Sequence, residues 1–464
     1  MNSKDNDGVL VGNWTGVYDD GTSPTEWSGS EAIFEEFMET KKPVKYGQCW
    51  VFAGLGTSVF RALGIPARTV TTFEAGRDKD SSLTVDTYFS EEDGSVLEDM
   101  SSEFVWNFHV WNDLWMARAD MPDGFGGWQA LDTCPQEMSG GLHRCGPASL
   151  SAVKQGQVYY NYDTMFMFAE VNGEEVDWIV TASGKMKPAD VNSRRIGKKI
   201  STKAVGEFQR QDVTDVYKYP EGTEEERVAV LEATKHVSSG KRLYNVGKKD
   251  VKFRIKTMDD AMVGEDIEFR VKIVNENKDE SREIFINVTC YSVRYTGVRV
   301  HEIFKNKEEF TLAAEETKFH KVVISADEYR DKLTESATLK FFVLAGVRST
   351  GQTFTGHYDY QLTRPQLNVE VPPEVRQKDS FEVQLSFTNP LPKLLQECLF
   401  RLESPGMEGH MKIKYRDVAP SGEALLRVKL IAKRPGTRQI IASFHSKQLT
   451  GLTGMATFKV TNVQ

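Results

Sequence analysis

Cys49, His109 and Asp132 are the residues of this sequence whose types and order best suit covalent chemistry. A thiolate can attack an acyl carbon, an imidazole can move the proton, and a carboxylate can hold the imidazole in one tautomer. Cys49 opens an apolar segment that ends at Gly64 and Pro66, a pattern typical of a helix and its end. Since a helix N-terminus favours a thiolate, this cysteine is the candidate nucleophile. The alternative is that all three residues only pack in the core, as such residues do in many proteins.

Two short segments predict neighbouring strands that would hold the histidine and the aspartate. His109 lies within Phe104–Trp111, where the alternation of residue types is that of a strand. A glycine-rich turn at 124–127 follows, and Asp132 ends the second candidate strand, Trp128–Asp132. The sequence therefore predicts a helix start and two adjacent strands around one site.

The composition is that of an ordinary globular protein. The chain has 464 residues, of which 39% are hydrophobic and 27% charged, and this length suggests about three domains. No run approaches the ~20 apolar residues of a membrane span. With 58 Lys and Arg against 67 Asp and Glu, the net charge is −9, which argues against nucleic acid as the main partner.

The cysteines and the N-terminus predict a reducing, intracellular setting. Five scattered cysteines in so long a chain are too few for a disulfide framework, and none forms a C-x-x-C pair for zinc. Residues 1–7 lack the apolar core of a signal peptide. We therefore expect a cytoplasmic protein by default.

The distribution of residue types divides the chain into three domains. All eight tryptophans precede residue 180, whereas the second half consists of short alternating runs separated by turns, as in β-sandwiches. Residues 240–250 have linker composition, and the segment 363–366 divides the second half into units of about 100 residues. The expected organisation is a mixed α and β domain at 1–239, the linker at 240–250, and β domains at 251–362 and 363–464.

Three longer motifs surround the candidate triad. They read Y-G-Q-C-W-V-F-A-G around Cys49, W-N-F-H-V-W-N-D around His109 and G-W-Q-A-L-D-T-C-P-Q-E around Asp132. The motifs, their order, and the separations of 60 and 23 residues between the three candidates resemble the active-site signatures of the animal transglutaminases. Further matching stretches extend into both β domains, so the resemblance covers essentially the whole chain.

The resemblance implies a fold, an activity and a set of partners. The fold would be an α+β papain-like (cysteine-proteinase-type) catalytic core followed by two all-β sandwich or barrel domains. The activity would be that of a protein-glutamine γ-glutamyltransferase. Cys49 would attack the carboxamide of a peptide-bound glutamine, ammonia would leave, and a lysine or another primary amine would take the acyl group from the thioester. His109 would move the proton and Asp132 would orient it. Partners would be glutamine-containing and lysine-containing proteins and small primary amines, with a homodimer left open.

Three aromatic residues match positions with known roles in that family. Trp14 matches the tryptophan whose indole N–H binds the oxyanion together with the backbone N–H of the nucleophile. Trp106 matches the second tryptophan of the amine tunnel, whose walls would shield the thioester from water. Tyr295 matches a tyrosine that hydrogen-bonds the catalytic cysteine at rest, so that the β domains would cover the site until calcium and substrate open it. The alternatives are core filling by the tryptophans and an ordinary strand tyrosine.

Calcium is the cofactor that the resemblance implies. In the loop 76–84, oxygen-bearing side chains stand at alternate positions, which suits a hard cation that takes six to eight oxygens. The alternatives are a solvated turn for this loop and an acidic helix N-terminus for residues 221–226. The family's ligand positions match three sets here: Asp78, Asp80, Ser82, Thr84 and Glu103; Asn172, Glu174, Glu221 and Glu226, with a backbone carbonyl near Ser193; and Asn2, Asn6 and Asp7.

The sequence also differs from the full-length members of that family. They have an N-terminal β-sandwich and the first part of the catalytic core ahead of the position at which this chain begins, so we expect a short isoform, a fragment or a late-starting gene model. The alternative function is that of a catalytically silent structural or adaptor protein, or of an inactive truncated isoform. A papain-like thiol hydrolase is a third candidate, which the aromatic tunnel disfavours. Some leaderless members act outside cells, so extracellular action stays open.

Overall fold

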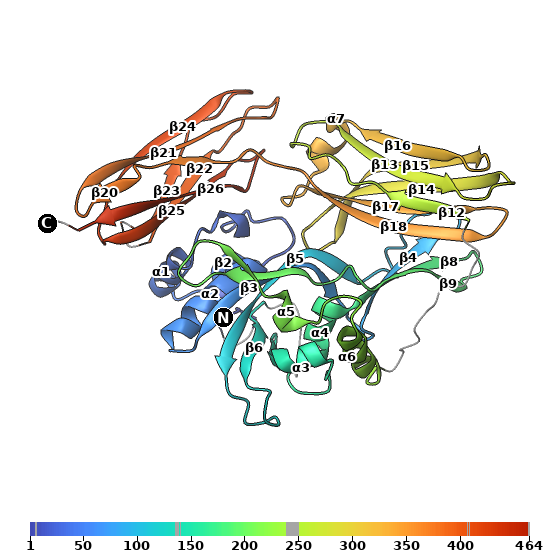
Figure 1. Ribbon diagram of the computed structural model, residues 1–464. Helices are drawn as coiled ribbons and strands as arrows, with labels where there is room; N and C mark the ends of the chain where they lie inside the picture. Colours follow the sequence, from blue (N-terminus) through green and yellow to red (C-terminus); the bar gives the residue numbers. More distant parts are fainter. Residues whose placement is uncertain are drawn as a thin grey trace. The chain divides into compact units, whose positions relative to one another are not determined.

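The chain forms two compact units, each built from segments that lie apart in the sequence. Figure 1 labels helices and strands of both units. The computed structural model describes residues 1–462 except 5–6, 135–138, 140, 238–249, 406 and 408, so the predicted linker lies outside the described residues apart from Asp250. The Cys49 unit comprises Met1–Leu55, Ala261–Glu265 and Thr363–Gln464, and the His109 unit comprises Gly56–Asp260 and Asp266–Leu362. Among the described residues, no helix is long and apolar enough to cross a membrane.

A six-stranded antiparallel sheet forms the centre of the His109 unit, in the order β11-β10-β3-β5-β6-β7. Buried side chains of this sheet and of four helices form one hydrophobic core, in which Trp111, Phe168 and Tyr217 are among the largest. The predicted strands at 104–111 and 128–132 are confirmed, and the first of them continues to Met116. The bounds are β3 Ala67–Arg77, β5 Phe104–Met116, β6 Gly127–Asp132, β7 Cys145–Ser149, β10 Lys198–Lys203, β11 Arg210–Asp212, α3 Leu150–Gln155, α4 Thr164–Asn172, α5 Thr214–Tyr217 and α6 Glu224–Thr234.

A smaller sheet, β4-β8-β9, joins this core to the first β domain within the same unit. Its strands are β4 Thr84–Ser90, β8 Glu174–Val180 and β9 Met186–Asn192, and β4 and β8 run parallel. Phe89 and Ile179 of this sheet pack in one cluster with Phe342 and Leu344 of the β domain. Because the strand that carries the latter two residues is buried at every position, it has apolar neighbours on both faces.

The first β domain is a sandwich of two antiparallel sheets, β12-β13-β16 and β15-β14-β17-β18. Phe269 of one sheet stacks on Phe341 of the other with 4.3 Å between ring centroids, so the two sheets face each other across a packed core. The strands predicted from the alternating runs in this region are confirmed. The bounds are β12 Val251–Ile255, β13 Ile267–Asn275, β14 Arg282–Val293, β15 Arg299–Leu312, β16 Thr317–Ile324, α7 Ala326–Tyr329, η2 Arg330–Lys332, β17 Thr338–Val347 and β18 Gln352–Gln361.

The N-terminal part of the Cys49 unit is built around two parallel strands and two helices. The predicted helix at Cys49 is confirmed as α2. It ends as expected, because the N–H of Ile65 bonds to the carbonyl of Phe60 at 2.9 Å and Gly64 has φ +82°. The boundary between the two units falls within this helix. The bounds are β1 Leu10–Gly12, η1 Pro24–Glu26, α1 Glu31–Thr40, β2 Val44–Gly47 and α2 Cys49–Ala62.

The second β domain completes the Cys49 unit with two further sheets, β19-β21-β24 and β20-β26-β25-β22-β23. The N-terminal segment packs on the polar face of β22, where Arg401 Nη2 lies 2.9 Å from Glu26 Oε2 and its guanidinium stacks on Trp27 at 5.4 Å. The bounds are β19 Asn368–Glu370, β20 Glu374–Arg376, β21 Ser380–Thr388, β22 Leu399–Ser404, β23 Gly409–Lys414, β24 Glu423–Ile431, β25 Gly436–His445 and β26 Leu452–Thr461.

Candidate active site

His109 and Asp132 form a buried hydrogen-bonded pair on the neighbouring strands β5 and β6. His109 Nε2 lies 2.8 Å from Asp132 Oδ2, and the two residues are 2% and 7% exposed. The second carboxylate oxygen of Asp132 accepts the backbone N–H of Cys134 at 2.8 Å, which fixes the carboxylate in place. An ionised carboxylate accepts the Nε2 proton, so Nδ1 is the ring nitrogen that can act as a base.

Aromatic rings enclose the imidazole of His109. Trp106 meets it edge-on with 4.7 Å between ring centroids, and Trp111 lies at 5.8 Å. Both tryptophans are buried, and the guanidinium of Arg77 lies over the ring of Trp106 at 4.9 Å from the ring centre. Water has little access to this imidazole, so charges on it interact more strongly than they would in solvent.

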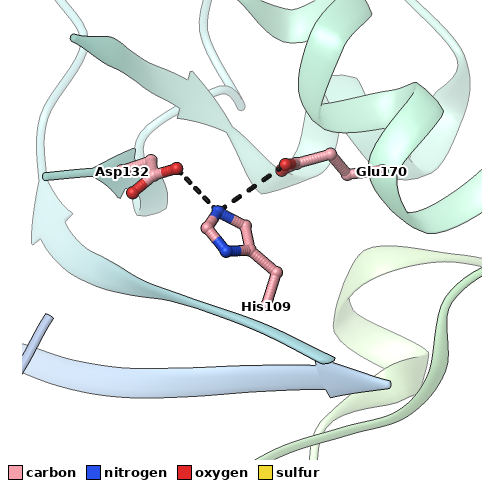
Figure 2. A group of neighbouring side chains, drawn as sticks. All are labelled: His109, Asp132 and Glu170. Atoms are coloured by element: carbon pink, nitrogen blue, oxygen red, sulfur yellow. Dashed lines mark hydrogen bonds and ion pairs between the residues drawn. The ribbon is translucent and has the colours of Figure 1, made fainter. Parts of the chain in front are cut away.

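Glu170, on α4, is a third member of this group that the sequence did not reveal. Its Oε1 lies 3.8 Å from His109 Nε2, and Figure 2 shows Asp132 and Glu170 approaching that nitrogen from two sides. Burial raises the pKa of Glu170 to about 8, against the opposing effect of His109. No local sequence signal identifies this contact, because tertiary packing alone brings α4 beside β5.

Cys49 and Trp14 lie together in the other unit. Cys49 is the first residue of α2 and is fully buried. The segment that carries Trp14 is fixed beside it, because the N–H of Asn13 bonds to the carbonyl of Gly47 at 3.1 Å. The side-chain amide of Gln48 donates to the carbonyl of Asn13 and to the Tyr18 hydroxyl, both at 2.9 Å. Of the predicted triad, the structure therefore brings together His109 and Asp132 in one unit and places Cys49 in the other.

Tyr295 lies in the turn between β14 and β15 and packs on the strand of His109. Its ring stacks on Phe108 at 4.8 Å and meets Trp106 edge-on at 5.8 Å. The backbone N–H of Asn107 donates to the Tyr295 carbonyl at 2.7 Å. A Cβ at Gly297, which has φ +76°, would lie 2.6 Å from a backbone oxygen of β5, so the turn approaches the strand closely. The first β domain thus covers the part of β5 that leads to His109, residues 104–108.

Three carboxylates of the first predicted calcium set converge. Asp78, Asp80 and Glu103 each bring one oxygen to within 4.8 Å of the others, and His109, Asp132 and Glu170 form the other such group in the described part of the chain. Burial raises the pKa of Asp78 to about 6 and that of Glu103 to about 7. Clustered carboxylates of this kind fit a hard cation, because an oxygen-rich donor set gains most from positive charge.

Ser82 and Thr84 complete the same loop. Asp78 accepts the backbone N–H groups of Asp80 at 3.1 Å, Ser82 at 3.2 Å and Leu83 at 2.8 Å, which gives the loop its curvature. The hydroxyls of Ser82 and Thr84 are 2.9 Å apart. The loop therefore presents side-chain oxygens of the type that was predicted.

The second and third predicted sets are more dispersed. Asn172 and Glu174 line a hollow of about 610 Å³ that also includes Ser82 and Thr84. Glu221 instead forms a 2.7 Å ion pair with Lys218, and Glu226 lies in the first turn of α6. In the third set, Asn2 Oδ1 accepts the N–H of Lys4 at 3.2 Å and Asp7 has φ +51°, while Asn6 lies outside the described residues.

Known proteins are similar to this chain in sequence and in fold. The family model of the transglutaminase-like superfamily matches residues 14–133, and that of the transglutaminase C-terminal Ig-like domain matches 251–355 and 365–462. The hemocyte protein-glutamine gamma-glutamyltransferase of Tachypleus tridentatus is 39% identical over 467 residues, which cover 98% of this chain and 61% of that protein. Annulin of Schistocerca americana is 38% identical, and 60% of it is covered. The chain thus spans about three fifths of the length of these curated relatives.

Two further matches cover a larger share of the known protein. Protein-glutamine gamma-glutamyltransferase E of Homo sapiens is 35% identical over 472 residues, 99% of this chain and 68% of that one. The crystal structure of red sea bream transglutaminase superimposes with a TM-score of 0.89 at 33% identity, over 99% of this chain and 67% of that chain. These matches confirm the predicted architecture, a papain-like core followed by two β domains. The chain therefore belongs to the transglutaminase family.

Proposed function

We propose that this chain catalyses calcium-dependent acyl transfer from a peptide-bound glutamine to a lysine or another primary amine, through a thioester on Cys49. The observation that carries the proposal is the buried His109–Asp132 pair, with Nε2 and Oδ2 2.8 Å apart, in a chain of this family. A second supporting feature is the position of Cys49 at the first turn of α2, where the helix dipole favours an anionic sulfur.

The proposed reaction has two halves, in which His109 carries one proton each way. Nδ1 of His109 takes the Cys49 proton, the sulfur attacks the carboxamide carbon, and the C–N bond breaks as the proton passes to the leaving ammonia. A neutral amine then attacks the thioester and gives its proton to Nδ1. The C–S bond breaks, the sulfur regains the proton, and an isopeptide bond remains. Asp132 holds the ring in the tautomer that both halves require.

In this proposal, Trp14 stabilises the carbonyl oxygen of the substrate, and Trp106 lines the path by which the amine enters. The Trp14 indole N–H would donate to the oxyanion, and the two hydrogen bonds of Asn13 to the residues ahead of Cys49 support that placement. Trp106 is buried against the imidazole, so it can keep water from the thioester while the amine enters.

Calcium and Tyr295 would regulate the site. One calcium ion would be held by Asp78, Asp80, Ser82, Thr84 and Glu103. Its positive charge would balance the negative charge of the three clustered carboxylates. Tyr295 packs on the aromatic residues beside His109, which supports a resting state covered by the first β domain. Release of that cover would require a shift of population towards an open form.

Incorporation of a labelled primary amine into a glutamine-rich protein tests the proposal, with and without calcium. The wild type should label the acceptor only with calcium, and Cys49→Ala should abolish labelling. Cys290→Ala is the matched control, because Cys290 is equally buried and lies in the first β domain. Release of ammonia without amine incorporation would indicate hydrolysis instead. Absence of turnover by folded wild-type protein would refute the enzymatic proposal and favour a structural or adaptor role.

A further inference from the structure

Lys218 buries an ammonium group in a cage of three oxygens. Its side chain is 4% exposed. Nζ donates to the carbonyls of Val171 at 3.0 Å and Ile196 at 2.9 Å, and to Glu221 Oε1 at 2.7 Å. An ammonium has three N–H donors, so each has an acceptor here. The arrangement satisfies a buried charge and two backbone carbonyls at once, which is the condition for burying them without a large cost.

The cage is made by the three segments that carry the second predicted calcium set. Val171 precedes Asn172 at the end of α4, and Ile196 follows Ser193 by three positions in the loop after β9. Glu221 belongs to both the cage and the set. Two carbonyls and a carboxylate are also the oxygen types that calcium takes as ligands. The Lys218 ammonium therefore lies where two backbone carbonyls and a carboxylate point towards one cation.

We propose that Lys218 is a tethered cation that calcium must displace from Glu221 in order to bind at the second site. The inference rests on the calcium dependence of the proposed function, because it presumes that the set of Asn172, Glu174, Glu221 and Glu226 also binds a calcium ion. Two cations held by one part-buried carboxylate repel each other, because the Glu221 side chain is 24% exposed and water screens charges there less than in bulk solvent. Lys218 and Glu221 both line a hollow of about 490 Å³, which leaves room for the ammonium to move off the carboxylate. Calcium binding is thus an exchange of one cation for another.

If calcium must displace Lys218, removal of the lysine should raise the affinity for calcium. In the wild type, part of the calcium binding energy is used to break the contact between Lys218 and Glu221. A hydrogen bond between two charged groups is strong enough that its removal should tighten calcium binding about tenfold or more. Without calcium, the same change leaves Glu221 and two carbonyls without their donor, so the variant should unfold at a lower temperature.

Calorimetric titration of the 464-residue chain with calcium tests the exchange. Lys218→Met should bind calcium about tenfold more tightly than the wild type, at a site that Glu226→Gln removes in the double variant. Lys199→Met is the matched control, because Lys199 lines the same hollow and none of the contacts among the described residues joins its side chain to Lys218 or Glu221. It should change the affinity by less than about twofold. Calcium should also restore the lowered melting temperature of Lys218→Met.

A second measurement uses the wild type alone and serves if Lys218→Met fails to fold. Acetylation by a water-soluble active ester, read residue by residue by mass spectrometry, should be slow at Lys218 in a chelator and faster with saturating calcium. Lys199, an exposed lysine of the same hollow, provides the internal reference. Unchanged protection of Lys218, or calcium binding by Lys218→Met that is no tighter than that of the wild type, overturns the exchange alone. A wild type that binds no calcium at a site sensitive to Glu226→Gln overturns the proposed second site together with the exchange.

Discussion

Replacing Asp132 by Asn removes the charge of the His109 partner and keeps its shape. In the wild type, one carboxylate oxygen accepts His109 Nε2 and the other accepts the backbone N–H of Cys134, each at 2.8 Å. The introduced amide has one acceptor oxygen, which the Cys134 N–H claims, so the amide NH₂ faces Nε2. Nε2 must then accept a hydrogen bond, and the ring proton moves to Nδ1. That is the nitrogen which the proposed mechanism needs as a base.

We expect the turnover number of Asp132→Asn to fall by about 10³- to 10⁴-fold, as for a triad whose histidine is held in the wrong tautomer. This corresponds to about 4–5.5 kcal/mol at about 1.4 kcal/mol for each factor of ten. The rate of labelled amine incorporation at saturating calcium and substrate measures it. The melting temperature should change little, because the variant keeps the side-chain volume and the bond to Cys134.

Asp113→Asn is the matched control for this change. Asp113 is fully buried on β5, the strand that carries His109, where it pairs with Arg68 at 2.8 Å, and it has no contact with His109 among those in the described residues. Its loss of charge leaves a guanidinium without its partner, so stability should fall by about 3 kcal/mol while the folded protein keeps its turnover. If folded Asp132→Asn retained more than about a tenth of the wild-type rate, the role of Asp132 in orienting His109 would be refuted.

Three further outcomes follow from the geometry. Tyr295→Phe removes a hydroxyl and keeps the stacking on Phe108, so calcium titration of amine incorporation should show a lower half-maximal concentration, and an unchanged one contradicts the regulatory role. Glu103→Gln removes a carboxylate from the loop cluster, and calorimetry should show calcium binding there weakened about tenfold; unaltered binding would exclude this residue as a ligand. Burial lowers the pKa of His445 to about 4, below its value of about 6.5 in the unfolded chain. As the pH drops, the unfolded chain therefore binds a proton at this residue before the folded chain does. The free energy of unfolding should fall between pH 6.5 and pH 4, by up to about 3 kcal/mol. Urea unfolding between pH 6.5 and pH 4 should show that the free energy of unfolding depends less steeply on pH in His445→Gln than in the wild type. An equal dependence on pH in both proteins would contradict the lowered pKa of His445.

The elements that hold the candidate site were predictable because their signals are local. An apolar run that starts at Cys49 and stops at Gly64 and Pro66 specifies α2 and its end. Aromatic residues and valines, which favour strands, are concentrated in β5, and a glycine-rich turn separates it from β6. Adjacent antiparallel strands then bring His109 and Asp132 within hydrogen-bonding distance without any information from the rest of the chain.

The remaining features depend on packing between segments far apart in sequence. Glu170 reaches His109 because α4 packs on the sheet, and no pattern within α4 identifies which strand it will meet. The cage around Lys218 joins three segments, of which two contribute backbone carbonyls that carry no residue-type signal at all. A sequence pattern can identify a charged residue, but the oxygens that surround it are set by tertiary structure.

The pairing of Glu26 with Arg401 means that the two parts of the candidate site form at different times during synthesis. These partners are 375 positions apart, whereas His109 and Asp132 are 23 apart. During synthesis on the ribosome, β5 and β6 emerge close together and can pair early, since short loops close first. The segment that leads to the thiol cannot dock on β22 until almost the whole polypeptide has been made. A nascent chain therefore carries an assembled imidazole–carboxylate pair long before the compact body around its sulfur is complete.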